Sequence, residues 1–174
     1  VQKVLDEYIL KLKEKKLQLL EVYLLEELRR LLHKENLITK VTINKISFEI
    51  TLYDKDENAI PKDLLSKGEQ QMFATGVLLA LARTSGKPLP FMIDTPLARL
   101  DVSHRDNMIE KFFPYASHQV VIFSTDSEIS EDYYRQLLPY LSRSYAMEYM
   151  PGKGKTKQHL GYFWNDKGER IVAV

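Results

Sequence analysis

Residues 65–70 read Leu65-Ser66-Lys67-Gly68-Glu69-Gln70 and stand at the start of a long segment with helical character. Glu69 follows Ser66 at capping-box spacing, so the sequence predicts a helix from about 67 to 84. The first backbone N–H groups of a helix lack partners within it, and Gly68 permits close approach of an anion. Taken alone, this segment indicates either an anion site or simply a well-capped helix.

A carboxylate closes the next predicted element. Residues 89–93 form a short apolar strand that Asp94 ends. Open α/β sheets bind ligands beyond the carboxyl ends of their parallel strands, and in phosphate-handling folds an aspartate there holds Mg²⁺ directly or through water. Asp94 also stands two residues before Pro96, which is common turn chemistry. This feature alone therefore indicates a metal ligand or a turn.

The surrounding pattern predicts an α/β domain preceded by a long helix. Residues 1–36 carry two successive leucine registers, which indicates either a coiled-coil root with a stutter or an amphipathic helix lying on its own domain. The remaining elements are predicted as strands at 46–52, 119–123, 146–150, 161–164 and 171–174 and helices at 104–113 and 131–140. The last three strands are expected to be antiparallel, and the earlier α/β rhythm predicts parallel strands.

Composition excludes several classes of function. The 174 residues include no cysteine, and the four histidines are scattered, so thiol catalysis, thiolate metal sites and a histidine metal site are not expected. The formal net charge of +1 gives no global basic field. No apolar run reaches membrane-spanning length and no signal peptide opens the chain, so we expect a soluble, cytoplasmic protein without a membrane partner.

The order of the polar segments is more informative than any one of them. The helix-opening segment 65–70 is followed by the strand with Asp94, then by Leu97-Ala98-Arg99-Leu100-Asp101, and then by a strand that runs into Ser124-Thr125-Asp126. This series resembles the C-terminal lobe of ABC-type P-loop ATPase heads of the SMC and RecF kind: signature loop, Walker B, D-loop and switch strand. The resemblance covers most of residues 41–130, and a coiled-coil arm matches residues 1–36.

The residues of the motifs resemble those of the DndD family, the SMC-like ATPases of bacterial DNA phosphorothioation (DNA sulfur modification) systems. This resemblance rests on Ser-Lys-Gly-Glu-Gln-Gln, on Pro-Phe-Met-Ile-Asp-Thr-Pro-Leu-Ala-Arg-Leu-Asp, and on the segment 118–128. The resemblance implies an ATP hydrolase whose cofactors are ATP and Mg²⁺. Its implied partners are a second head, DNA and other sulfur-modification proteins.

The resemblance also implies roles for individual residues. Asp94 would help hold Mg²⁺. Ser66, with the backbone around Gly68, would contact the γ-phosphate of ATP bound by the opposite head. The residues that would bind nucleotide in trans are Leu65, Ser66, Lys67, Gly68, Glu69 and Gln70. Those that would line the dimer seam are Ala98, Arg99, Leu100 and Asp101. The catalytic set would be Asp94, Thr95, Thr125 and Asp126.

Two positions depart from the family pattern. SMC-like heads place a glutamate directly after the Walker B aspartate, where this chain has Thr95, and the switch position, often histidine, is Thr125. A hydroxyl does not act as a general base near neutral pH without help. Either hydrolysis is slow, or a carboxylate such as Asp126 or Glu128 substitutes.

The sequence contains no Walker A motif. Gly154-Lys155-Thr156 lacks the required glycine five positions earlier, where Tyr149 stands, and Gly86-Lys87 fails in the same way. We therefore expect a coiled-coil root at 1–36 and a C-terminal head lobe at 37–174 that needs an N-terminal Walker A lobe from its full-length chain. The chain opens at Val1 in mid-helix pattern, which also indicates a fragment.

Two other functions stay open at this stage. Thr95 favours a non-hydrolysing DNA-binding or scaffold module of ABC shape, and the shared nucleotide motifs also fit a repair-type SMC-like or RecF-like head. Lys153, Lys155 and Lys157, with His159, form either a DNA-contacting patch or a solvated hairpin tip.

Overall fold

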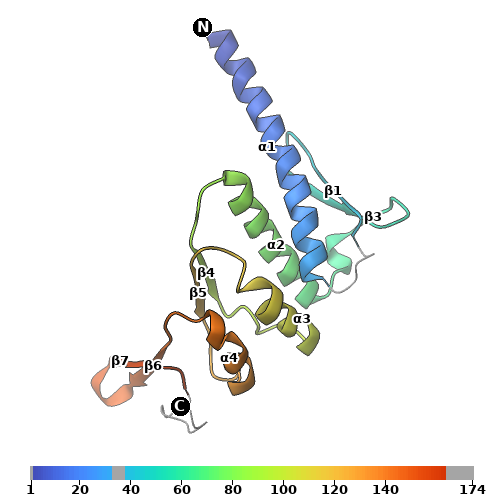
Figure 1. The fold of residues 1–174 in the computed structure, drawn as a ribbon. Coiled ribbons are helices and arrows are strands. Elements are labelled where there is room, and N and C mark those ends of the chain that lie inside the picture. Colours follow the sequence, from blue (N-terminus) through green and yellow to red (C-terminus); the bar gives the residue numbers. More distant parts are fainter. Residues whose placement is uncertain (1, 33–37, 164–174) are drawn as a thin grey trace. The chain divides into compact units, whose positions relative to one another are not determined.

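The computed structural model describes residues 2–32 and 38–163. They form two compact units, the first within residues 1–93 and 98–121 and the second within 94–97 and 122–174. The division passes through two strands, β4 (Phe91–Asp94) and β5 (Val120–Phe123). Figure 1 shows the elements in chain order.

Helix α1 spans Gln2–Leu31 and uses its two leucine registers differently. In the second register, Leu24, Leu28 and Leu31 are fully buried in the first unit, whereas Leu20 is half-buried. In the first register, Leu5 is 55% and Tyr8 62% exposed, whereas Leu19 is half-buried. The long helix is confirmed, although it ends at Leu31 and residues 33–37 lie outside the described part of the chain. A coiled-coil role for the exposed half stays a prediction.

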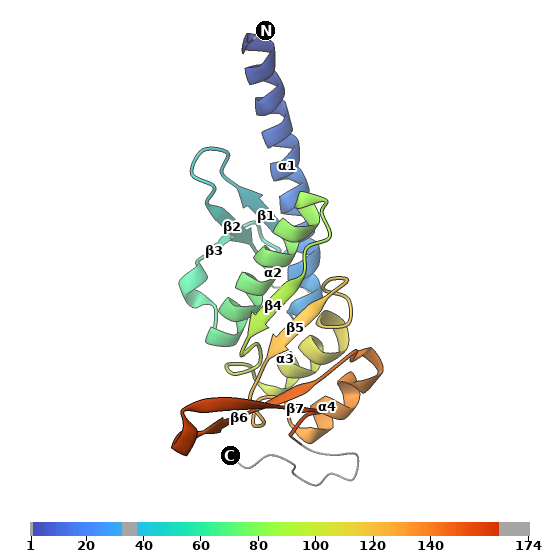
Figure 2. The ribbon, with the colours of Figure 1, turned by 90° about the vertical axis from the view of Figure 1, so that its left-hand side faces the viewer.

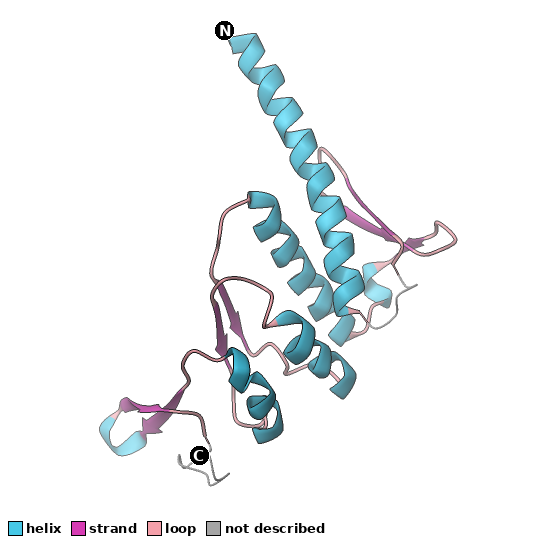
Figure 3. Ribbon diagram, in the orientation of Figure 1, coloured by secondary structure: helices cyan, strands magenta, loops and turns pink. Residues whose placement is uncertain are grey.

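Helix α2 (Lys67–Ser85) packs along the second half of α1, and the two helices lie side by side in Figure 3. Gly76 makes the close approach possible, since a Cβ there would lie 3.1 Å from Cδ2 of Leu28. Arg83 adds ion pairs of 2.8 Å to both Glu26 and Glu27 of α1. Glu27 is buried, so this pairing satisfies a charge that would otherwise be costly.

A three-stranded antiparallel sheet, ordered β1-β2-β3, belongs to the same unit. Its strands are β1 (Lys40–Ile43), β2 (Ile50–Tyr53) and β3 (Ala59–Ile60). The predicted strand at 46–52 is therefore wrong in its first half. The Asn44 side chain accepts hydrogen bonds from the backbone N–H groups of Ile46 and Ser47, which makes a turn there. Turn chemistry thus overrode the alternating pattern.

Strands β4 and β5 form a two-stranded sheet and run side by side in Figure 2. Phe91 N–H donates to Gln119 O and Thr95 N–H donates to Phe123 O, each at 2.8 Å. Both strands advance by four residues between these bonds, so they are parallel, as the sequence predicted. Between them the chain forms helix α3 (Val102–Asn107) and a π-helical turn, Met108–Phe112, which together replace the helix predicted at 104–113.

The second unit contains helix α4 (Glu131–Leu137) and an antiparallel hairpin of β6 (Tyr145–Met150) and β7 (Lys155–Leu160). The prediction placed a strand at 161–164, which is wrong: the partner of β6 begins at Lys155, within the basic stretch. Residues 164 and 171–174 lie outside the described part. Short 3₁₀ turns occur at Lys62–Leu64, Leu138–Tyr140 and Pro151–Lys153. Across the described helices, none is long and apolar enough to cross a membrane.

Candidate functional site

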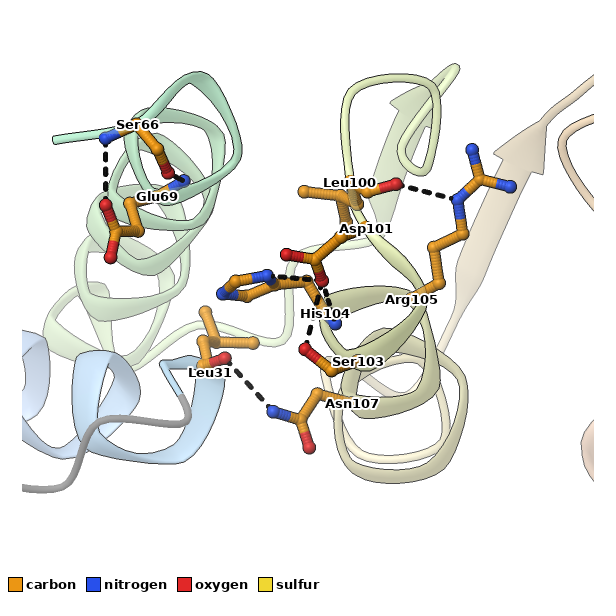
Figure 4. A network of polar contacts seen from close by, with 9 residues as sticks. All are labelled: Leu31, Ser66, Glu69, Leu100, Asp101, Ser103, His104, Arg105 and Asn107. Carbon is orange, nitrogen blue, oxygen red and sulfur yellow. Dashed lines mark hydrogen bonds and ion pairs between the residues drawn. The ribbon is translucent and has the colours of Figure 1, made fainter.

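The predicted signature loop forms the N-terminus of α2, and its local geometry follows from sequence. Ser66 Oγ accepts from Glu69 N–H at 3.2 Å, while Glu69 Oε2 accepts from Ser66 N–H at 2.8 Å, so the predicted capping box is confirmed (Figure 4). The Gln70 side chain donates to Leu65 O at 3.0 Å and closes the turn before the helix. Leu65 is buried and anchors the loop, whereas Ser66 and Lys67 are exposed.

Gly68 brings this loop against the predicted seam segment 98–101. A Cβ at Gly68 would lie 3.5 Å from the carbonyl oxygen of Arg99 and 3.6 Å from Cδ2 of Leu100. Leu100 is buried, and its carbonyl accepts from Arg105 Nε at 3.0 Å (Figure 4). Two sets of residues that are separate in sequence and were predicted to share one function therefore meet in the first unit.

Asp101 caps helix α3 from the end of the same segment. Its Oδ1 accepts from the backbone N–H of His104 at 2.9 Å and from Ser103 Oγ at 3.0 Å, and it lies 2.8 Å from His104 Nδ1 (Figure 4). The backbone hydrogen bond from His104 is the main cause that lowers the pKa of Asp101 to about 2. The side chain is exposed and ionised at neutral pH, so it is available to the surface that the sequence assigns to a dimer seam.

Asp94 and Thr95 lie in the second unit, at the carboxyl end of β4, and both are exposed. Thr95 has a φ of 46°, a left-handed value that is unusual for a β-branched residue. Such strain persists only where the surroundings hold it, and it concentrates at functional sites. The turn buries the next two residues, Pro96 and Leu97, and so is anchored in the core of its unit.

The predicted switch residues follow β5 in the same unit. Thr125 is exposed and its Oγ1 lies 3.1 Å from Ser127 Oγ, while Asp126 is partly exposed. Glu128 is different, because it is 4% exposed and its Oε1 accepts from the backbone N–H of Leu97. A buried, hydrogen-bonded carboxylate is poorly placed to polarise water, so the geometry does not favour Glu128 as the substitute base.

Sequence reasoning missed Tyr162. Its hydroxyl lies 3.0 Å from Ser124 Oγ, 3.1 Å from Thr125 O and 3.3 Å from Ile129 O. The ring stacks on Tyr134 at a centroid distance of 4.6 Å. Burial is the main cause that raises the pKa of Tyr162 to about 12, so the hydroxyl stays a proton donor at neutral pH. No local pattern signals this contact, since it joins residues more than thirty positions apart.

The sequence assigns metal binding at this site to Asp94. No cluster of three or more acidic or histidine side chains among the described residues could hold a metal ion alone. Mg²⁺ in nucleotide sites is commonly bound by one or two carboxylates together with phosphate oxygens and water. An exposed carboxylate at the end of a parallel strand fits that arrangement. A hollow of about 610 Å³ in the second unit, lined by residues between 134 and 161, contains none of the predicted site residues.

The comparisons with known proteins concern the fold. No family model and no curated protein matches the sequence. Among solved structures, an SMC ATPase from a study of ATP-driven dimerization and DNA-stimulated activation matches with a TM-score of 0.58 and 12% identity, over 90% of this chain and 89% of the other. The SMC head domain from Thermotoga maritima gives 0.54 and 14% identity, over 83% of this chain and 48% of the other.

An Smc head domain with a coiled coil and joint from Pyrococcus yayanosii gives a TM-score of 0.59 and 14% identity, over 87% of this chain and 28% of that one. The present chain thus spans less than half of the length of the last two structures. The fold of this chain resembles that of SMC head domains, with parallel strands, an antiparallel C-terminal hairpin and an N-terminal helix.

Proposed function

We propose that this chain is the C-terminal half of an SMC-like ATPase head and that its signature loop acts on ATP held by an opposite head. The observation that carries the proposal is the capped N-terminus of α2, packed through Gly68 against the segment 98–101 within an SMC head fold. A helix N-terminus with an exposed serine is suited to a phosphate. The exposed Asp101 lies at the start of the next helix of the same unit.

In this proposal the chain's residues have separate tasks. Asp94 helps hold Mg²⁺ on ATP, and Ser66 with the backbone at Gly68 binds the γ-phosphate from the other head. The segment 98–101 lines the seam between heads. Bound Mg-ATP would supply the charge that bridges the two heads, and loss of the γ-phosphate would release them, as in other nucleotide switches.

The test is dimerisation of a head completed with its N-terminal Walker A lobe. We expect Mg-ATP to double the molar mass measured by light scattering, and Ser66→Arg to abolish this by filling the phosphate position. Ser142→Arg, the same change at an exposed serine of the second unit, is the matched control and should still dimerise. A completed wild-type head that stays monomeric with Mg-ATP would contradict the proposal.

A second candidate is a non-hydrolysing DNA-binding or scaffold module of ABC shape. Thr95 favours it, because a strained threonine occupies the position where SMC-like heads carry the catalytic glutamate. Phosphate release from the completed head, compared with Asp94→Ala, separates the two functions. Release above the Asp94→Ala background supports hydrolysis, and release equal to that background supports the non-hydrolysing module.

We further propose that this head serves bacterial DNA sulfur modification in the cytoplasm, with DNA and other sulfur-modification proteins as partners. The support is the resemblance of the motif sequences between residues 66 and 128 to those of the DndD family. Deleting the gene should remove phosphorothioate linkages from cellular DNA, measured by mass spectrometry of nuclease digests. An unchanged phosphorothioate content together with sensitivity to DNA damage would instead indicate a repair-type SMC head.

A further inference from the structure

Glu128 is a buried carboxylate between β5 and α4. Charged side chains are rarely buried without partners, because removing them from water is costly. Oε1 of Glu128 accepts from the backbone N–H of Leu97, whereas Oε2 has no hydrogen-bond partner within the described part of the chain. The carboxylate is therefore retained at some cost, and its one hydrogen bond is directed to the turn that follows Asp94.

That turn is held at two points. Thr95 N–H donates to Phe123 O at 2.8 Å, and Leu97 N–H, two residues further on, donates to Glu128. Thr95, with its left-handed φ of 46°, lies between Asp94 and the buried residues Pro96 and Leu97. Because an L residue leaves this conformation readily when it is not constrained, the second anchor has a function: it fixes the backbone next to Asp94.

The segment that carries Glu128 is itself fixed. The N–H groups of Glu128 and Ile129 both donate to Thr125 O at 3.2 Å. The Tyr162 hydroxyl lies within hydrogen-bonding distance of Thr125 O and Ile129 O, on either side of Glu128. Stacking on Tyr134 orients that hydroxyl. A continuous set of contacts thus leads from Tyr162 through the segment 124–129 to Leu97, all within the second unit.

We propose that Glu128 is a positioning residue of the nucleotide site: it fastens the Asp94–Leu97 turn to the switch segment 124–129. This inference rests on the proposed function. It assigns Glu128 a different role from general base, since its hydrogen-bonding oxygen and its reach matter, not its charge. Tyr162 supports the same link from the opposite side of the switch segment.

Two conservative variants of the full-length protein test the proposal. Glu128→Gln keeps the reach and an acceptor oxygen, so we expect kcat for ATP hydrolysis within about threefold of wild type. Glu128→Asp keeps the charge but is one methylene shorter, so we expect kcat to fall by roughly 10²-fold with little change in KM. Glu131→Gln and Glu131→Asp, at the nearby surface pair with Arg135, are the matched controls. Loss in Glu128→Gln with activity kept in Glu128→Asp would overturn the positioning role.

A measurement without nucleotide separates this inference from the proposed function. In the 174-residue chain, hydrogen exchange of the Leu97 amide is followed by NMR. Exchange should stay near the wild-type rate in Glu128→Gln and be at least about tenfold faster in Glu128→Asp. Equal exchange in the wild type and Glu128→Asp would overturn the inference. A wild-type head that neither dimerises nor hydrolyses ATP would overturn the proposed function instead, whatever the amide shows.

Discussion

Ser66 and Asp101 each cap a helix and each belong to a segment that we assign to ATP-dependent dimerisation. In both cases a side-chain oxygen accepts from a backbone N–H three residues on, at 3.2 Å for Ser66 and 2.9 Å for Asp101. Loss of such a cap costs about 1 kcal/mol, which a domain of this size tolerates. Loss of the cap alone should therefore leave the head folded, and an unchanged circular dichroism spectrum of Ser66→Arg checks this before its loss of dimerisation is interpreted.

Asp101 gives a prediction for pH dependence. Its pKa is about 2 in the folded chain, against an ordinary value of 3.8, so its ionised form stabilises the fold. That contribution is fully present above pH 3.8 and is lost as pH falls through about 2. Asp101→Asn keeps an acceptor but does not titrate. Urea unfolding should show that the advantage of wild type over Asp101→Asn shrinks between pH 5 and 2, and a constant difference would contradict this.

Tyr162 gives a prediction for stability at alkaline pH, whereas that for Asp101 concerns acidic pH. Burial raises its pKa from 10.0 to about 12, so its contribution to stability is complete below pH 10 and is lost as pH rises through 12. Tyr162→Phe keeps the stacked ring and has no proton to lose. We expect the stability advantage of wild type over Tyr162→Phe to decline from pH 9.5 to 11.5 in chemical unfolding. An advantage that does not change with pH would show that the hydroxyl is not held as described.

Residue-level prediction succeeded where the physics is local. The capping box needs only the spacing of Ser66 and Glu69, and the position of Asp94 at the end of β4 needs only an apolar run before it. The metal-binding role of Asp94 stays a prediction. The contacts of Tyr162 were not predictable, because they depend on how β7 returns the chain to the end of β5. The contact of Glu128 with Leu97 was not predictable either, because it depends on the pairing of β4 with β5. The left-handed φ of Thr95 was equally hidden, since nothing in Asp94-Thr95-Pro96 requires it.

Among the elements, α1 has one part that is buried in its unit and another that is exposed to solvent. Its second leucine register packs on α2 and the π-helical turn, and Asn107 Nδ2 donates to Leu31 O at 3.3 Å near its end. Its first register, around Leu5 and Tyr8, is exposed. The change of register that the sequence displays therefore coincides with the point at which the helix leaves its own unit's core, near the buried Leu17.

This division predicts unequal effects of one substitution on the same helix. Leu28 is fully buried, so Leu28→Ala should lower the free energy of unfolding by about 2–5 kcal/mol. Leu5 is 55% exposed, so Leu5→Ala should change it by less than about 0.5 kcal/mol. Thermal and urea unfolding of the two variants provide the comparison. Similar losses in both would mean that the N-terminal half of α1 is also packed.

Element prediction failed where two signals competed. Ile46 and Phe48 continue the alternation of β2, yet the side chain of Asn44 turns the backbone there and leaves Ile46 89% exposed. In the hairpin, Lys155 and Lys157 indicated a solvated turn. These residues instead alternate with Thr156 and Gln158 along the strand β7, which pairs with β6. The parallel pair β4 and β5 was predicted correctly because both strands are short apolar runs bounded by turn residues.

At the scale of the whole molecule, the site residues form two sets that belong to different units. The signature loop and seam lie in the first unit, and Asp94 with the switch segment lies in the second. In our account, the signature loop of one head and the Asp94 of the other complete each ATP site. One set can therefore be substituted in one head and the other set in a second head. Mixing the two variants then tests whether the signature loop and Asp94 of one ATP site come from opposite heads.

The most direct test mixes two completed heads, one with Ser66→Arg and the other with Asp94→Ala. Neither variant alone forms an intact site, but a mixed dimer has one site that combines an intact Asp94 with an intact Ser66. A mixed dimer has one of the two sites of a wild-type dimer, so phosphate release should rise clearly above that of either variant alone, to no more than about half of the wild-type rate. A mixture as inactive as either variant alone would contradict the claim that the signature loop acts across the dimer.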